Sequence, residues 1–207
     1  MNKVGFIGLG IMGAPMSRNL MKAGYPVMVF NRSRGPMEAA ARDGAEMAES
    51  LTQLAASCNV IFTMLPNSPQ VKEVVLGEGG IASAAKPGTL IIDMTSGAPG
   101  DSKDIYAALK NKDIHIIDAP VSGGEPMAIA GTLAIMVGGD KTDFERALPY
   151  LKAVGKTATW VGPIGSGNTC KLTKLAFNNN AVGVCIFNNF FCKSYIFFIG
   201  MLGAVNH

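Results

Sequence analysis

Short, unbroken apolar runs recur along the first 160 or so residues, separated by segments whose apolar positions have helical spacing. Strands that are buried on both faces of a parallel sheet show this continuous apolar character, whereas strands with one solvated face alternate apolar and polar residues. The pattern predicts strands over residues 3–8, 26–31, 59–65, 89–94, 114–120, 133–139 and 157–162.

Helical patterns lie between these runs. One face of the first predicted helix carries Met12, Met16, Leu20 and Ala23. Four further helices are predicted. One follows Ser50 as its N-cap, one begins at Ser68-Pro69, and two extend over residues 99–112 and 142–153. Alternating strands and helices predict an α/β fold, a Rossmann-type doubly wound sheet that is mostly parallel.

Charge and cysteine content exclude several classes of protein. The formal net charge is +3 and is dispersed, so nothing indicates a nucleic-acid partner. The four cysteines, Cys58, Cys170, Cys185 and Cys192, form no CxxC pair and have no histidine cluster near them. We therefore expect no metal site and no disulfide framework, but reduced thiols as in the cytoplasm. The N-terminus runs directly into a strand, so we predict no secretory signal.

The character of the chain changes after about residue 176, where Phe and Asn become frequent and Lys193 is the one charged residue from 175 to 205. The uncharged run 195–205 is shorter than the ~20 residues that a membrane span needs. A longer span would bury Asn188, Asn189 and Lys193, which is costly. We therefore expect a buried or interface helix here and no membrane partner.

A glycine motif of the G-x-G-x-x-G type stands directly after the first strand and before the first helix, as Gly8, Leu9, Gly10, Ile11, Met12 and Gly13. In a Rossmann turn the first glycine permits the tight turn, the second lets the backbone approach a pyrophosphate, and the third allows close packing of helix on strand. The helix N-terminus offers N–H groups to the phosphates. The alternative is a glycine-rich turn that binds nothing.

The end of the second strand bears on the choice of cofactor. An acidic residue that binds the adenine ribose normally stands there in NAD enzymes. Asn31 occupies that place and Arg32 follows it. No acidic side chain would therefore repel the 2′-phosphate of NADP, and the guanidinium group of Arg32 can pair with that phosphate. Both NAD and NADP remain possible cofactors, with a modest preference for NADP; alternatively, Arg32 is a solvated charge.

Several stretches together resemble the β-hydroxyacid dehydrogenase family, and most closely its tartronate semialdehyde reductase members. They are VGFIGLGIMGAPMSRNL, MLPNSPQVKEVVLGEGGI, KPGTLIIDMTS, DAPVSGGEPMAIAGTLAIMVGGD and GSGNTCKL, spread over about residues 1–172. The resemblance implies reversible hydride transfer between a nicotinamide cofactor and a hydroxy acid or semialdehyde. It also implies a homo-oligomer in the family, which is doubtful for this chain.

The resemblance assigns roles to particular residues. The loop Leu65, Pro66 and Asn67, together with Thr95 or Ser96, would contact the cofactor, and Ser122, Gly123 and Gly124 would hold the substrate carboxylate. Lys171 stands at the position of the family's catalytic lysine. An ammonium group there can stabilise and protonate the oxygen of an aldehyde that receives hydride. Without the resemblance, these residues would be interpreted as turns, a loop and a surface lysine.

The resemblance ends just after Lys171. Family members place an asparagine one helical turn later, where this chain has Lys174, and they continue into an all-helical second domain. We expect a helical tail in place of that domain, and interpret the change as truncation with an altered reading frame. The predicted division is 1–164 for the dinucleotide-binding domain and 165–207 for the start of the interdomain helix and the tail.

Two classes of function follow. The first is an oxidoreductase that reduces tartronate semialdehyde to glycerate, with 3-hydroxyisobutyrate dehydrogenase and glyoxylate or succinate semialdehyde reductase as alternatives within the class. The second is a non-catalytic NAD(P)-binding fragment. The histidines, His115 and His207, are expected to be structural or solvated.

Overall fold

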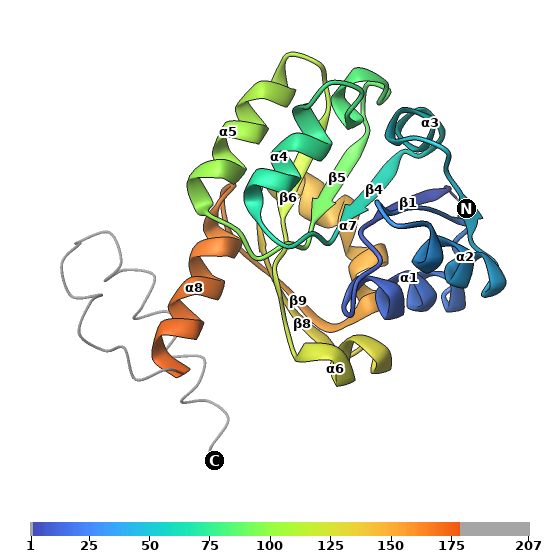
Figure 1. Ribbon diagram of the computed structural model, residues 1–207. Helices are drawn as coiled ribbons and strands as arrows, with labels where there is room; N and C mark the ends of the chain where they lie inside the picture. Colours follow the sequence, from blue (N-terminus) through green and yellow to red (C-terminus); the bar gives the residue numbers. More distant parts are fainter. Residues whose placement is uncertain (1, 179–207) are drawn as a thin grey trace. The chain divides into compact units, whose positions relative to one another are not determined.

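The computed structural model describes residues 2–178 (Figure 1). The chain divides into two compact units, residues 1–172 and 173–207, and the fold described below is that of the first. The tail helix expected from the sequence lies outside the described residues. Among the residues that are described, no helix is both long enough and apolar enough to cross a membrane.

One sheet forms the centre of the first unit. Its core is parallel, in the order β3-β2-β1-β4-β5-β6; β8 then runs antiparallel to β6 and β7 and parallel to β9. The strand order reverses between β1 and β4, which is where open α/β sheets bind ligands beyond the carboxyl ends of their strands. The strands are β1 (Val4–Ile7), β2 (Val27–Phe30), β3 (Glu46–Met47), β4 (Val60–Thr63), β5 (Leu90–Asp93), β6 (His115–Asp118), β7 (Val121–Ser122), β8 (Leu133–Gly138) and β9 (Gly155–Gly162).

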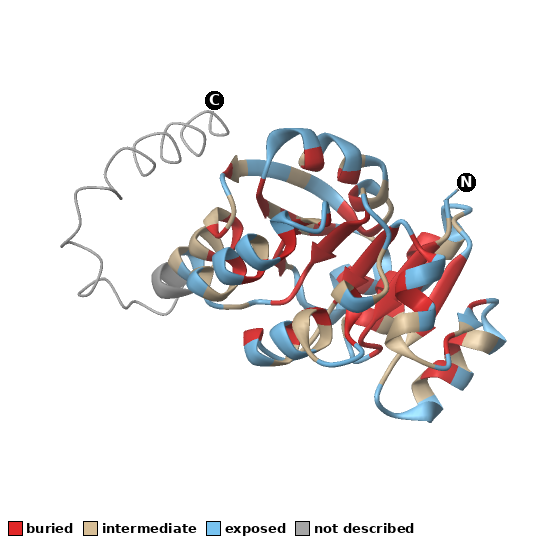
Figure 2. Ribbon diagram, turned by 90° about the horizontal axis from the view of Figure 1, so that it is seen from above, coloured by how far each residue is buried: buried red, intermediate tan, exposed pale blue. Residues whose placement is uncertain are grey.

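Helices cover both faces of this sheet (Figure 1), and its central strands are buried throughout (Figure 2). One core cluster joins the sheet to α1, α2, α6 and α7, and the other joins it to α3, α4 and α5. Side chains alternate between these clusters along each central strand, so both faces demand apolar residues. The helices are α1 (Gly13–Lys22), α2 (Arg34–Arg42), α3 (Leu51–Ser57), α4 (Ser68–Leu76), α5 (Pro99–Lys110), α6 (Gly124–Ala130), α7 (Lys141–Val154) and α8 (Ser166–Asn178), with a 3₁₀ turn at Ile81–Ser83.

The predicted α/β fold is confirmed, and each predicted strand is present to within two residues. Ser50 caps α3 as predicted, its hydroxyl accepting a hydrogen bond from the N–H of Gln53 at 3.1 Å. The helix predicted from Ser68-Pro69 begins there, with Asn67 as its N-cap. The pattern missed β3, β7, α2 and α6, because each is too short to show a clear period or opens with Gly and Pro.

Candidate cofactor and substrate site

The glycine loop lies between β1 and α1, beside the ends of β2 and β4. Gly8 has φ +96°, and a Cβ atom there would lie 2.2 Å from the carbonyl oxygen of Met64. A Cβ atom on Gly13 would lie 1.9 Å from the carbonyl oxygen of Gly8. Both glycines are therefore required by the packing of the loop on itself and on the neighbouring strand.

Gly10 has a different environment. No heavy atom lies within 4 Å of the position of its absent Cβ atom, so the packing of the protein does not require glycine here. The open space lies at the N-terminal end of α1, and no hydrogen bond within residues 2–178 uses the N–H groups of Ile11 or Met12. Backbone donors beside an open space, at a helix N-terminus, suit a pyrophosphate. The loop therefore fits a dinucleotide.

Asn31, at the end of β2, supports this loop. Its side-chain oxygen accepts a hydrogen bond from the N–H of Leu9 at 3.0 Å, and its side-chain nitrogen donates to the carbonyl of Ser33. Arg34 pairs with Glu38 at 2.9 Å, whereas none of the ion pairs among residues 2–178 includes the exposed Arg32. Of the two arginines, Arg32 is the better candidate for contact with a cofactor phosphate.

The loops after β4 and β5 meet at the same edge of the sheet. The hydroxyl of Thr95 is buried and accepts a hydrogen bond from the N–H of Leu65 at 3.0 Å, so it holds the 65–67 loop. Pro66 and Ser96 are exposed. The sequence left Thr95 and Ser96 as alternatives for cofactor contact; the geometry favours Ser96 and gives Thr95 a supporting role.

Lys171 lies against the segment that follows β6. Its Nζ atom donates a hydrogen bond to the carbonyl oxygen of Val121 at 2.8 Å. Val121 directly precedes Ser122, Gly123 and Gly124, the predicted substrate segment. The structure therefore brings the predicted lysine and the predicted substrate segment together, across 50 residues of sequence.

Two buried carboxyl groups stand at the ends of adjacent strands, and sequence reasoning did not single them out. Burial raises the pKa of Asp93 to about 6 and the pKa of Asp118 to about 7, against the opposing effect of their hydrogen bonds. Asp93 accepts from Thr63 and from the N–H of Thr95, and Asp118 accepts from the N–H groups of Gly165 and Asn168. The signal in the sequence was an apolar run that ends in Asp, present in both LIID and HIID.

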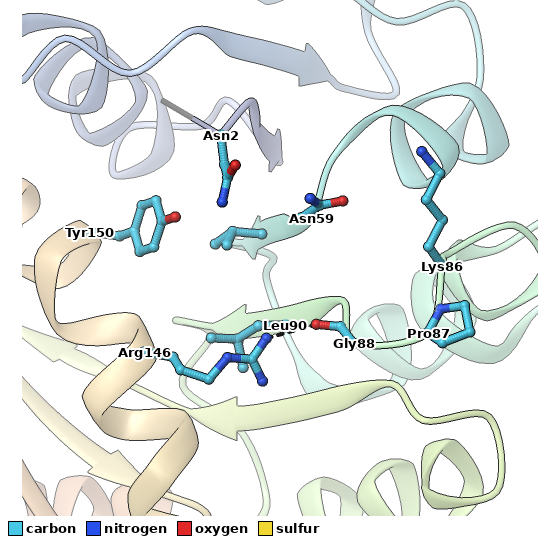
Figure 3. Close-up of a pocket in the computed structure, with 9 residues that line it drawn as sticks. Asn2, Asn59, Lys86, Pro87, Gly88, Leu90, Arg146 and Tyr150 are labelled. Atoms are coloured by element: carbon cyan, nitrogen blue, oxygen red, sulfur yellow. Dashed lines mark hydrogen bonds between the residues drawn. The ribbon is translucent and has the colours of Figure 1, made fainter.

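The opposite edge of the sheet has a separate polar cluster. His115, at the start of β6, is 2.9 Å from the buried carboxylate of Asp143, which also pairs with Arg146. Arg146 also donates a hydrogen bond to the carbonyl oxygen of Gly88 at 2.7 Å. Both residues line a shallow cavity of about 530 Å³ (Figure 3). This cavity lies at the amino ends of β4 and β5, away from the glycine loop, which is the candidate dinucleotide site. His115 bonds to Asp143 at this edge and lies outside that candidate site.

Within residues 2–178, no group of histidine, cysteine, aspartate and glutamate side chains could hold a metal ion. Cys58 is buried and Cys170 is half-buried. Cys185 and Cys192 lie outside the described residues.

The fold and the glycine loop together define a dinucleotide-binding domain. Comparison with known proteins leads further: residues 3–162 match the NAD binding domain of 6-phosphogluconate dehydrogenase. The chain is 43% identical over 184 residues to the 2-hydroxy-3-oxopropionate reductase of Escherichia coli, covering 87% of this chain and 62% of that protein. It is 43% identical over 170 residues to the 2-(hydroxymethyl)glutarate dehydrogenase of Eubacterium barkeri, covering 82% of this chain and 56% of that protein.

A solved structure gives the same result. The 3-hydroxyisobutyrate dehydrogenase of Mycobacterium tuberculosis, determined with L-serine, superposes with a TM-score of 0.82 at 35% identity, over 88% of this chain and 62% of that one. The chain belongs to the NAD(P)-dependent β-hydroxyacid dehydrogenase family through its NAD-binding domain. It spans about three fifths of the length of the relatives that it matches.

Proposed function

We propose that this chain binds NAD(P) at the glycine loop and takes part in hydride transfer between that cofactor and a β-hydroxy acid or its semialdehyde. The observation that carries the proposal is the contact of Lys171 with the carbonyl of Val121, beside the Ser122–Gly124 segment. This contact places an ammonium group at the carboxyl edge of the sheet, the edge that also carries the glycine loop.

In the proposed reaction, the reduced nicotinamide supplies a hydride when it is bound. The aldehyde carbon accepts the hydride, the C=O π electrons move to the oxygen, and Lys171 gives that oxygen a proton. Ser122 and the N–H groups of Gly123 and Gly124 bind the substrate carboxylate and so orient the carbonyl toward Lys171. The lysine contributes both charge stabilisation and general acid catalysis.

For the cofactor we propose a modest preference for NADP over NAD. Two features support it: Asn31 replaces the usual acidic residue, and Arg32 is exposed at the end of β2 without an ion pair among the described residues. A guanidinium group can pair with the 2′-phosphate of NADP through two hydrogen bonds. NAD has no 2′-phosphate and cannot form this pair. Leu65, Pro66, Asn67 and Ser96 complete the proposed cofactor contacts.

For the substrate we propose tartronate semialdehyde, which would be reduced to glycerate. The similarity to the E. coli 2-hydroxy-3-oxopropionate reductase supports this choice. Relatives of similar identity carry other names, including 2-(hydroxymethyl)glutarate dehydrogenase and 3-hydroxyisobutyrate dehydrogenase. Methylmalonate semialdehyde, glyoxylate and succinate semialdehyde therefore belong in the same assay, to test the alternatives within the class.

A second candidate function is an NAD(P)-binding module that does not turn over substrate. The observation that favours it is Lys174, which stands where the resemblance places an asparagine that positions the substrate. Without that asparagine the substrate would be oriented less well, so the cofactor would bind without turnover.

One experiment tests the proposal and separates the two candidates. The full chain is titrated with NADPH and NADH by fluorescence, and the absorbance of NADPH is then followed with each semialdehyde. We expect binding and turnover, with turnover lost in Lys171→Ala and kept in the control Lys112→Ala, an exposed lysine bonded to the carbonyl of Ala82. Binding without turnover would establish the second candidate, and the absence of binding would contradict both.

A further inference from the structure

The first turn of α8 is held by a residue from a distant strand. Lys171 lies one turn further along the same helix. The first N–H groups of a helix have no partners within the helix. Here Asp118, at the end of β6, is the hydrogen-bond partner of two of these groups. One of its carboxylate oxygens accepts from the N–H of Gly165 and the other from the N–H of Asn168, each at 2.7 Å. From this geometry we propose that Asp118 is a positioning residue that sets Lys171 against the substrate segment.

The packing around Asp118 leaves it little freedom to move. Asp118 as a whole residue is 1% exposed. A Cβ atom on Gly138 would lie 2.4 Å from Oδ1 of Asp118, and one on Gly167 would lie 2.5 Å from the carbonyl oxygen of Asp118. Both positions need glycine because the end of β8 and the first turn of α8 close directly on this carboxylate. Contact with Asp118 thus explains why residue 167 is a glycine.

A second contact fixes the same helix relative to the same segment. Lys171 lies four residues after Gly167, so the two share one face of the helix. That face meets Asp118 at the first turn and Val121 at Lys171, where Nζ donates to the carbonyl oxygen. Two residues, Ala119 and Pro120, separate Asp118 from Val121 along the chain. The segment from 118 to 121 therefore sets both the start of the helix and the position of its ammonium group.

A third contact ties this turn to the cofactor side of the site. The side-chain oxygen of Asn168 accepts from the N–H of Gly97 at 2.9 Å, and its nitrogen donates to the hydroxyl of Ser102 at 3.1 Å. Gly97 follows Ser96, which is proposed to contact the cofactor. The first turn of α8 is thus anchored between the β6 segment and the loop after β5, and a shift of that turn would move Lys171 relative to both.

The inference rests on the proposed function, since that function gives Lys171 its chemical role. Its test compares Asp118→Asn with Asp143→Asn in the full chain. Both aspartates are 1% exposed and accept hydrogen bonds on both oxygens, but Asp143 bonds to His115 and Arg146 at the other end of β6. An amide at position 118 can accept only one of the two N–H groups and places a donor against the other.

Two readouts are measured on the folded protein, well below the melting temperature of each variant. The first is kcat, together with the dissociation constant of NADPH. In Asp118→Asn we expect kcat to fall about 10- to 100-fold, as for a catalytic group displaced by ~1 Å, with NADPH affinity changed less than twofold. In Asp143→Asn we expect neither to change. Equal losses of kcat in the two variants would overturn the proposal, since a structural defect alone would act on both.

The second readout needs no turnover. Lysine acylation followed by mass spectrometry gives the labelling rate of Lys171 relative to the other lysines of the same chain. We expect this rate to rise severalfold in Asp118→Asn, because the hydrogen bond to Val121 is loosened, and to stay unchanged in Asp143→Asn. If the wild type shows this labelling pattern but no turnover, the proposed function fails and the positioning role stands. If turnover is present and labelling is identical in all three proteins, the positioning role fails.

A measurement on the wild type keeps the test intact should Asp118→Asn not fold. Amide hydrogen exchange at Gly165 and Asn168 is expected to be as slow as in the central strands, because their N–H groups are bonded to a buried carboxylate. Fast exchange at these two amides, as is usual in the first turn of a helix, would contradict the proposal.

Discussion

Replacing Gly10 by alanine separates the cofactor role of the glycine loop from its structural role. A Cβ atom at this position meets no heavy atom within 4 Å, and the backbone φ is not in the left-handed region. The substitution therefore does not strain the protein alone. It does place a methyl group where the loop would meet a pyrophosphate, so we expect binding to suffer while folding does not.

The expected magnitudes follow from these contacts. A methyl group that keeps the phosphates away from the backbone N–H groups removes a charge-assisted hydrogen bond, a loss of about 1.5–3 kcal/mol. Since 1.4 kcal/mol is about tenfold in affinity, NADPH should bind roughly 10- to 100-fold more weakly. The free energy of unfolding should be unchanged or higher by about 0.4–1 kcal/mol, because alanine restricts the unfolded chain.

The assay is a fluorescence titration with NADPH, paired with thermal melting of the protein without cofactor. Gly100→Ala is the matched control: its Cβ atom also has no neighbour within 4 Å, and we expect normal binding. In Gly13→Ala the Cβ atom would lie 1.9 Å from the carbonyl oxygen of Gly8, so both Tm and binding should fall. Gly10→Ala with unchanged NADPH affinity, or with a Tm as low as that of Gly13→Ala, would refute the reasoning.

Three further predictions concern the cofactor, pH and the core. Arg32→Ser should weaken NADPH binding about tenfold and leave NADH binding unchanged, as measured by parallel titrations; equal losses for both would contradict the role of Arg32. Burial raises the pKa of Asp93 from 3.8 to about 6, so its contribution to stability is present at low pH and is lost as pH rises through about 6. The Tm of the wild type should therefore fall relative to that of Asp93→Asn between pH ~4 and ~7; parallel Tm curves would exclude this. Phe62→Ala removes a fully buried ring stacked on Phe6 and should cost about 3–5 kcal/mol in urea denaturation; a cost under ~1 kcal/mol would show that the ring is not packed as described.

The parts of the fold that could be predicted from sequence are those with a local signal. The strand before Gly8 is a continuous apolar run and the helix after Gly13 is amphipathic, so the loop between them could be placed without tertiary information. The same holds for Ser50, whose capping bond reaches only three residues along the chain. Short elements such as α6 were missed, since seven residues that open with Gly-Glu-Pro show no clear period.

The remaining parts of the site depend on contacts between distant residues. Asp118 bonds to groups 47 and 50 residues later, and no local pattern predicts such a contact. The alternatives Thr95 and Ser96 could be separated only once the structure showed Thr95 buried and bonded to Leu65. For Lys171, the family resemblance selected the residue, and the structure supplied its contact with Val121.

The central claim, that the dinucleotide binds at the carboxyl edge of the sheet, is tested most directly by NMR. NADP⁺ is titrated into the ¹⁵N-labelled full chain, and the changes in amide chemical shift are mapped. We predict saturable changes at residues 8–13, 31–32, 65, 67 and 95–97. Changes centred instead on Lys86, Gly88 and Arg146 at the opposite edge, or no saturable change at all, would contradict the claim.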